Sequence, residues 1–158
     1  MATSPTTDDA VREFAGQLLF RLWRASHTRT AEALESLGLT TALFALLNVV
    51  GAHEGAIQQE IGAAMGIDPS TMVSLIDQLE AEGLAKRRPR PTDRRAREVV
   101  ITPKGRRVLK QARQLALQVE DDVLRGLTAS ERGQLLTLLR RALGSAPPQP
   151  LWRAEEEK

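Results

Sequence analysis

The 158-residue sequence contains no cysteine and no tyrosine, and its aromatic rings are limited to three phenylalanines, two tryptophans and two histidines. The absence of cysteine excludes disulfides, thiolate metal sites and thiol-based redox sensing. The scarcity of aromatic rings argues against RNA or single-stranded partners, because proteins that bind them stack bases on exposed rings.

Long apolar segments are also missing. No apolar run approaches the roughly 20 residues that a helix needs to cross a bilayer. The polar N-terminus lacks the charged-then-apolar order of a signal peptide. A chain of 158 residues suits one domain with a substantial core. We therefore expect a soluble, cytoplasmic domain that does not associate with membranes.

Constellations of catalytic residues are absent as well. The chain has no glycine-rich phosphate loop, no cysteine nucleophile, and no cluster of histidine and acidic residues at metal-ligand spacing. The two histidines, His27 and His53, each lack a serine context. The sequence therefore predicts that the protein is not an enzyme and uses no metal or cofactor.

What the chain does have is segregated positive charge. Twelve of its 22 lysine and arginine residues lie between Lys86 and Arg113, where the only acidic residues are Asp93 and Glu98. Twelve minus two gives this stretch a net charge of +10, whereas the whole chain carries +2. Such segregation indicates a polyanionic partner, and double-stranded DNA is the leading one.

The spacing of apolar residues predicts a mainly helical fold. A long amphipathic helix is expected over residues 8–38, and a second helix runs from the capping residue Thr40 until Gly51 closes it. A short third helix covers Gln58 to Met65. Ile57 stands just before it, where a capping serine or threonine is expected.

A turn at Gly66 leads into a fourth helix, which starts at Asp68 and Pro69, runs to about Glu82 and stops at Gly83. An aspartate before the helix can accept hydrogen bonds from free backbone amides, and proline at the first helical position loses none. A helix fits the major groove of B-DNA and reads bases with short polar side chains. The alternative is an ordinary amphipathic helix with solvated serines. The candidate DNA-binding residues of this recognition helix are Pro69, Ser70, Thr71, Ser74 and Gln78.

The next segment predicts a β-hairpin. Leu84 to Arg88 can form one strand, Pro89 and Pro91 end it, and Ala96 to Ile101 alternates as a second strand. The polar tip between the strands forms a wing beside the helix-turn-helix. An arginine held on a rigid tip can enter a narrow minor groove, where the potential is most negative, and we assign this role to Arg95.

Asp93 can hold the tip by accepting hydrogen bonds from an arginine, and Arg94 is expected to contact either Asp93 or a phosphate. Lys86 and Arg87 are further candidate phosphate contacts. A solvated charged surface is the alternative, which the order of helix, turn and hairpin disfavours. The candidate DNA contacts of the wing are Arg88, Arg90, Asp93, Arg94, Arg95 and Arg97.

After the hairpin, Thr102 and Pro103 restart a helix, and Thr128 opens a sixth, leucine-rich helix that ends near Gly144. The proline-containing residues 145–158 predict a flexible tail.

The first helix and the last two carry apolar stripes that extend beyond what a small wing core can cover. Two copies related by a two-fold axis would bury these stripes, with the same patch meeting itself. A monomer that folds its terminal helices back on itself is the alternative, but it would present only one recognition helix. The candidate interface residues are Val11, Phe14, Leu18, Leu135, Leu138, Leu139 and Ala142.

The segment from Gln59 to Gly105 resembles the winged helix-turn-helix core of the multiple antibiotic resistance regulator (MarR) family. The flanking helices match the family in length and order, so the resemblance covers nearly the whole chain. It implies a homodimer that binds a pseudo-palindromic operator and is released by a small molecule. The resemblance rests on Asp68-Pro69-Ser70-Thr71, Leu79-Glu80-Ala81-Glu82-Gly83-Leu84, Asp93-Arg94-Arg95-Ala96 and Ile101-Thr102-Pro103-Lys104-Gly105.

The expected architecture is one mainly α domain. Dimerisation helices occupy residues 8–38 and 104–144, and a winged helix-turn-helix lobe with a small β-hairpin occupies residues 40–103. A homodimeric repressor of transcription is the expected function. A winged-helix module that binds proteins and not DNA is the alternative, but its mark would be the loss of wing arginines, which abound here.

Two positions depart from the family pattern. The family often has an arginine at the position of Ser74 and a small polar residue at that of Val73, so its base preference does not carry over. Family regulators commonly take phenolic or carboxylate effectors. Trp23, Arg24 and His27 are candidate effector contacts, since Trp23 and His27 are four residues apart and share a helix face. The alternative places Trp23 in the core or interface and His27 on the surface.

Overall fold

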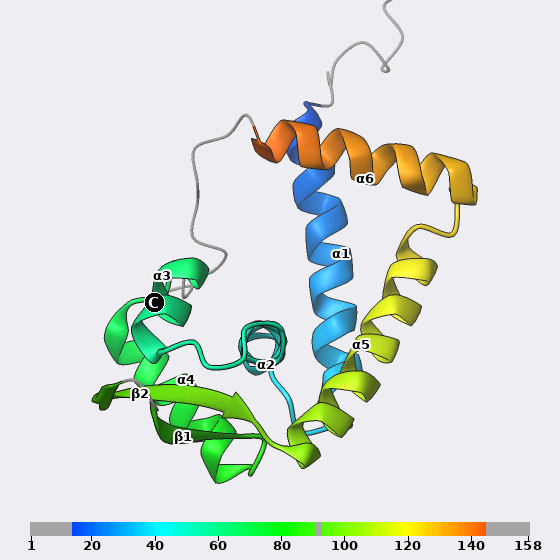
Figure 1. The fold of residues 1–158 in the computed structure, drawn as a ribbon. Helices are drawn as coiled ribbons and strands as arrows, with labels where there is room; N and C mark the ends of the chain where they lie inside the picture. Colours follow the sequence, from blue (N-terminus) through cyan, green and yellow to red (C-terminus); the bar gives the residue numbers. More distant parts are fainter. Residues whose placement is uncertain (1–13, 91–92, 145–158) are drawn as a thin grey trace, which may run out of the picture.

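A computed structural model describes residues 14–90 and 93–144, with only the backbone described at residues 93–95. The described chain is mainly helical with one antiparallel hairpin, as predicted (Figure 1). In chain order its elements are α1 (Ala15–Glu35), α2 (Thr41–Ala52), α3 (Gln58–Met65), α4 (Pro69–Ala81), β1 (Ala85–Arg90), β2 (Asp93–Ile101), α5 (Pro103–Val123) and α6 (Ala129–Gly144).

The elements form two parts (Figure 1). Helices α1 and α5 lie side by side, and α2, α3, α4 and the hairpin form a lobe at one end of this pair. Helix α6 leaves the pair at the other end. The lobe holds the predicted recognition helix α4 next to the predicted wing, β1 and β2.

The hydrophobic core lies in the lobe. Its buried side chains come from α2, α3, α4 and the hairpin, and Leu34 of α1 with Leu109 and Ala112 of α5 joins them. By contrast, Leu34 is the only buried residue among the described residues of α1, and α6 has none. The lobe therefore covers its own apolar surface, whereas α1 and α6 do not.

The helix starts follow the capping chemistry expected from the sequence. The hydroxyl of Thr40 accepts a hydrogen bond from the Leu43 amide at 3.2 Å, and the hydroxyl of Thr102 accepts one from the Gly105 amide at 2.9 Å. At Ile57 the Glu60 carboxylate accepts from the backbone amide at 3.0 Å. Ile57 also pairs with Glu98 of β2 in an isolated antiparallel bridge, a role that suits a β-branched residue.

The end of the second helix differs from the prediction. Gly51 does not close α2, which continues to Ala52. A Cβ atom at Gly51 would lie 2.9 Å from Cδ2 of Leu109, so the missing side chain serves the packing of α2 against α5. The first helix also ends earlier than expected, at Glu35, and Gly38 adopts a left-handed turn with φ +66°.

The predicted end of the second strand at Ile101 is confirmed, but the other strand boundaries predicted for the hairpin are wrong. Pro89 does not end β1, which runs to Arg90 and pairs Pro89 with Arg97, with a shift of register after Pro89. A two-stranded sheet has only edge strands, and an edge strand tolerates proline because the missing amide faces solvent. The second strand begins at Asp93, opposite Arg90, so residues 93–95 belong to β2 and not to the tip.

Close packing around residue 105 explains why the segment Ile101 to Gly105 ends in a glycine. A Cβ atom there would lie 2.0 Å from the carbonyl oxygen of Leu84 and 2.8 Å from Ile101. The hydroxyl of Thr102 donates to the Gly83 carbonyl at 2.7 Å while it caps α5. This segment therefore locks the start of α5 against the base of the hairpin.

Candidate nucleic-acid interface

Helix α4 begins with a complete cap. The Asp68 carboxylate accepts hydrogen bonds from the backbone amides of Ser70 and Thr71, both at 3.0 Å, and from the Ser70 hydroxyl at 2.5 Å. The Ser70 hydroxyl, followed by the Thr71 hydroxyl and amide, holds the pKa of Asp68 well below its ordinary value. The first turn of α4 is thus fixed while its N-terminus stays open to solvent.

One face of α4 is exposed along its length. Pro69, Ser70, Ser74 and Gln78 are exposed as a DNA-contacting face requires, whereas Thr71 is half-buried. The Gln78 amide donates to the Ser74 hydroxyl at 3.4 Å. The opposite face carries the buried residues Met72, Leu75, Ile76 and Leu79. The helix therefore has an anchored apolar side and a free polar side.

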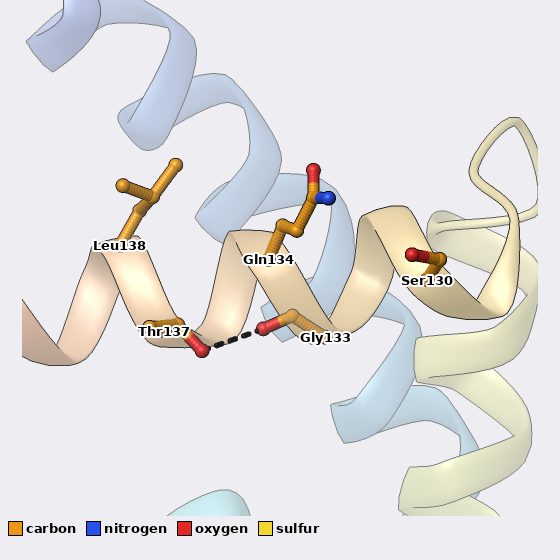
Figure 2. A pocket seen from close by; sticks show the side chains of 5 residues that line it. All are labelled: Ser130, Gly133, Gln134, Thr137 and Leu138. Atoms are coloured by element: carbon orange, nitrogen blue, oxygen red, sulfur yellow. Dashed lines mark hydrogen bonds between the residues drawn. The ribbon is translucent and has the colours of Figure 1, made fainter.

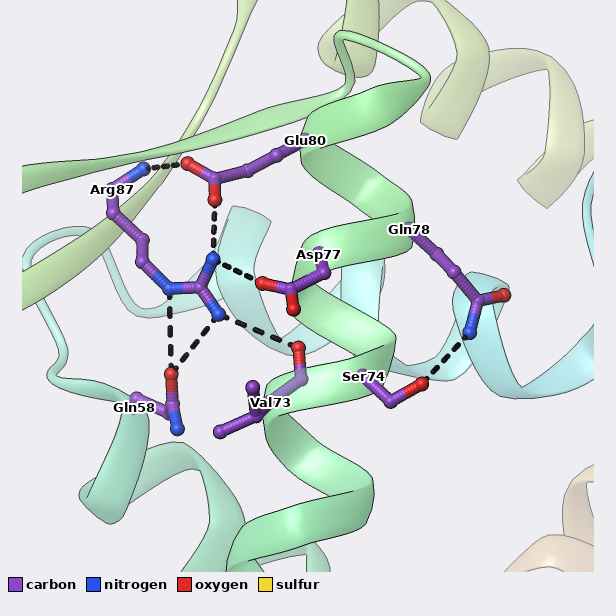
Figure 3. A network of polar contacts seen from close by, with 7 residues as sticks. All are labelled: Gln58, Val73, Ser74, Asp77, Gln78, Glu80 and Arg87. Atoms are coloured by element: carbon purple, nitrogen blue, oxygen red, sulfur yellow. Dashed lines mark hydrogen bonds and ion pairs between the residues drawn. The ribbon is translucent and has the colours of Figure 1, made fainter.

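Arg87 of β1 is tied to this helix (Figure 3). Its guanidinium donates to Asp77 at 2.6 Å and forms an ion pair with Glu80, whose carboxylate also accepts from the Arg87 amide at 2.6 Å. The same guanidinium donates to Gln58 of α3 at 3.3 Å and to the Val73 carbonyl at 3.4 Å. Arg87 thus joins α3, α4 and β1, and it neutralises acidic side chains on the recognition helix.

Sequence reasoning treated Arg87 as one of several phosphate contacts and missed this network. The available signal was the pair Asp77 and Glu80, two acidic residues one turn apart on a helix expected to approach a polyanion. Such residues call for a cation to balance them.

Two more wing arginines have acidic partners. Arg88 forms an ion pair with Glu98, which is only 4% exposed. Arg90 lies 3.8 Å from the Glu60 carboxylate of α3. Lys86 and Arg97 are exposed. The first pair joins the two strands of the hairpin, and the second fastens the hairpin to α3. Both reduce the positive charge that these arginines offer to solvent.

The side chains of Asp93, Arg94 and Arg95 lie outside the described residues. Their backbone belongs to β2, so they extend the hairpin beyond the pair of Pro89 with Arg97. The roles assigned to them from the sequence stay predictions.

The candidate dimer residues are largely uncovered. Phe14 is 66% exposed, Leu18 46% and Leu138 59%, while Leu135 and Leu139 are half-buried and Val11 lies outside the described residues. Ala142 is exposed as well. Figure 2 shows an open groove on α6, whose lining residues are Ser130, Gly133, Gln134, Thr137 and Leu138.

The candidate effector residues are split between two faces of α1. The rings of Trp23 and His27 stack with centroids 4.8 Å apart, which confirms that they share a face. Arg24 instead lines a shallow pocket with Phe20, Arg21, Ala25 and Thr28, and neither ring of the stack lines that pocket.

Neither a metal site nor a membrane span is found in the described part of the chain. No group of histidine and acidic side chains there is placed to hold a metal ion. None of the described helices is both long and apolar enough to cross a membrane.

Comparison with known proteins shows to which family the chain belongs. The MarR family model matches residues 37–96, from just before α2 into β2. A protein of Thauera aromatica assigned to transcriptional regulation of the hcr operon is 35% identical over 133 residues, or 80% of this chain and 79% of that protein. The chain belongs to the MarR family.

Solved structures of MarR-family regulators share its fold. The transcriptional repressor CouR, bound to a 23-mer DNA duplex, is 30% identical with a TM-score of 0.77, over 89% of this chain and 99% of that one. BpsR of Bordetella bronchiseptica is 27% identical with a TM-score of 0.73, over 85% and 96% of the two chains. The protein is thus a MarR-family transcriptional regulator.

Proposed function

We propose that this regulator is a homodimeric repressor that binds a pseudo-palindromic operator and releases it when a small aromatic or carboxylate effector binds. The exposed apolar side chains on α1 and α6 carry the proposal, because they lie on the two elements that the core of the lobe leaves uncovered.

The dimer follows from the cost of leaving these side chains in water. Burial of apolar surface is favourable by about 25 cal/mol per Å². Phe14, Leu18 and Leu138 are each about half exposed or more in one chain. A two-fold interface would bury each of them twice, and Leu135, Leu139 and Ala142 extend the same helix α6. The open groove of α6 lets a second helix approach closely.

The operator follows from the dimer. Two copies of α4 related by a two-fold axis would enter successive major grooves, with half-sites ~10 bp apart. Ser70, Ser74 and Gln78 offer hydrogen bonds to base edges, and the N-terminus of α4 at Pro69 faces a phosphate.

The wing contacts are assigned by charge and, for Lys86 and Arg97, also by exposure. Lys86 and Arg97 contact phosphates, and Arg95 enters the minor groove with Arg94 beside it. Arg88 and Arg90 contribute less, since each already shares its charge with a carboxylate. Arg87 supports α4 from within the protein and does not contact DNA.

The effector proposal draws on two relatives. DNA binding by BpsR is regulated by 6-hydroxynicotinic acid, and CouR has been solved with p-coumaroyl-CoA, so both ligands contain an aromatic ring. Here the half-exposed Trp23, stacked on His27, offers a ring surface, and Arg24 on the same helix offers a cation. We assign the effector to the middle of α1, around Trp23, Arg24 and His27.

Selection of bound fragments from random duplex DNA tests the proposal, combined with sedimentation of the free protein. We expect a palindromic consensus, a dimer mass, and an affinity that falls steeply with salt because neutralised phosphates release counterions. Arg95→Ala should weaken binding strongly at fixed salt without loss of fold or dimer. Aromatic acids added to the gel-shift assay should release the DNA.

The opposite outcomes are equally clear. A monomer in sedimentation removes the dimer, and a consensus without two-fold symmetry removes the palindromic operator. A selection that enriches no duplex favours the protein-interaction module. An unchanged affinity for Arg95→Ala removes the wing tip from the mechanism.

A further inference from the structure

Val73 stands out on the surface of the lobe. It is 41% exposed, and among the described residues of the lobe it is the only large apolar side chain with such exposure. All the other exposed large apolar side chains of the described chain lie on α1, α5 and α6 or at the start of α1. The proposed dimer would cover those of α1 and α6, but it leaves Val73 unexplained.

Val73 lies on the exposed side of α4, next to the proposed reading face. It follows Ser70 by three residues and precedes Ser74. Figure 3 shows Val73 on the flank of α4 that carries Asp77 and the Arg87 network, with Ser74 and Gln78 on the other flank. An exposed apolar side chain therefore borders the polar face formed by Ser70, Ser74 and Gln78.

The structure also holds Val73 still. Its carbonyl oxygen accepts a hydrogen bond from Arg87 at 3.4 Å, and Arg87 is itself held by Asp77 and by Gln58. A β-branched side chain in a helix has one strongly preferred rotamer. The Val73 side chain therefore loses little conformational entropy on binding. Even a small buried contact area then gives a favourable binding free energy.

The chemistry of Val73 selects its partner in the major groove. Valine offers two methyl groups and no hydrogen-bond donor or acceptor. Of the four bases, only thymine presents a methyl group in that groove. A base that presents a donor or acceptor against Val73 would lose its hydrogen bond to water without replacement.

We infer that Val73 is a specificity-determining residue that packs against the 5-methyl group of a thymine in each half-site. This inference rests on the proposed function, because it requires α4 to enter the major groove. Ser74 and Gln78 supply the neighbouring polar contacts, and the network around Arg87 sets the position of the valine.

The test replaces thymine by deoxyuridine, which keeps every hydrogen-bonding group and lacks only the methyl. A duplex selected by the wild-type protein from a random library is the probe, and each thymine of a half-site is replaced in turn. We expect one thymine whose replacement weakens wild-type binding about fourfold, the value for burial of one methyl group. Replacement in both half-sites should weaken it by roughly the square of that factor.

Val73→Ala is the paired variant. Val73 is exposed and alanine is the best helix former, so the variant should keep its fold and dimer. It should bind the thymine and deoxyuridine duplexes equally well at the identified position. Ser74→Ala is the matched control, expected to bind more weakly yet to keep the fourfold preference for thymine.

Several outcomes overturn the inference while the proposed function stands. These are a consensus without a fixed thymine in each half-site, equal wild-type affinity for every deoxyuridine duplex, and an unchanged thymine preference in Val73→Ala. Identical DNA binding by Val73→Ala and wild type would show that Val73 does not contact DNA, and its exposure would then indicate contact with a protein partner. If the wild type binds no duplex at all, the proposed function is overturned as well. The other outcomes differ from this one because the wild type still binds duplex DNA in them.

Discussion

The lobe buries its apolar residues, whereas helices α1 and α6 leave most of theirs exposed. In the lobe, Leu46, Leu47 and Ile76 are completely buried, and charged residues such as Arg87 and Glu98 find partners on neighbouring elements. On α1 and α6, by contrast, Leu34 is the only buried residue among those described, and apolar side chains such as Leu18 and Leu138 are about half exposed. A region that satisfies its own apolar and charged groups can fold as a unit, whereas one that leaves them open needs a partner. The comparison separates the lobe proposed to read DNA from the helices proposed to form the dimer.

Gly105→Val should have the largest effect on stability, because the backbone at Gly105 packs directly against the backbone at Leu84. A Cβ atom would lie 2.0 Å from the Leu84 carbonyl oxygen, a contact that only a shift of α5 or the hairpin can relieve. We expect the free energy of unfolding to fall by at least about 3 kcal/mol in urea denaturation. Gly126→Ala is the control, since nothing lies within 4 Å of its added Cβ. Equal stability of the two variants would contradict the packing described here.

Leu138→Asp should separate the two regions. Its side chain is 59% exposed in one chain, so the lobe should keep its fold, but a carboxylate at a two-fold interface meets its own copy. We expect a monomer in sedimentation and a loss of operator affinity of about 100-fold or more, since the second half-site is no longer tethered.

Gln118→Asp is the matched control for this variant, because it adds the same charge at an exposed polar position of α5. It should stay dimeric. A dimeric Leu138→Asp with normal affinity would show that α6 is not the interface.

Arg87→Ala and Lys86→Ala compare two adjacent cations of β1. Arg87 is mostly buried among hydrogen-bond acceptors, so its loss should lower the free energy of unfolding by about 1–2 kcal/mol. This value is reduced because Asp77 is exposed and solvent screens its ion pair with Arg87. It should also weaken DNA binding, because Asp77 and Glu80 then face the phosphates unbalanced. Lys86 is exposed, and its loss should leave stability unchanged, weaken binding to all duplexes alike and reduce the salt slope by roughly one.

Asp77→Asn in the Arg87→Ala background decides whether charge or position matters. If Arg87 acts by neutralising the helix, this second change restores part of the DNA affinity. If affinity stays low, Arg87 acts by positioning α4 alone.

Asp68→Ala should show a smaller effect than these variants, and that effect should depend on pH. The lowered pKa means that the cap stabilises the folded state above the ordinary pKa of 3.8 and loses this contribution as pH falls below it. We expect the melting temperature of the variant to be a few degrees lower at neutral pH. The difference from wild type should shrink steadily in acid.

Glu131→Ala makes the same comparison on α6. Hydrogen bonds from the Thr128 amide and then its hydroxyl also lower the pKa of Glu131, and α6 buries no residue. Its effect on melting should therefore be smaller than that of Asp68. An equal effect would show that α6 folds together with the lobe.

Much of the fold was predictable from the sequence because its signals act within one helical turn. The bounds of α3 match the prediction, and Thr40, Asp68 and Thr102 cap the helices expected of them. The candidate face of α4 was also predictable, since the apolar spacing leaves Ser70, Ser74 and Gln78 on one side. Errors arose where the deciding neighbour is distant: Leu109 for Gly51, and the partner strand for Pro89.

The sequence by itself determined the helices, their caps and the charge of the wing, because each depends on residues a few positions apart. Only the tertiary structure decided which cations face solvent. Arg87 meets Gln58 from 29 positions away, and Arg88 meets Glu98 across the hairpin, contacts that no local pattern contains. The tertiary structure also left Val73 exposed beside the polar face of α4, because the buried side of that helix was already filled by Met72, Leu75, Ile76 and Leu79.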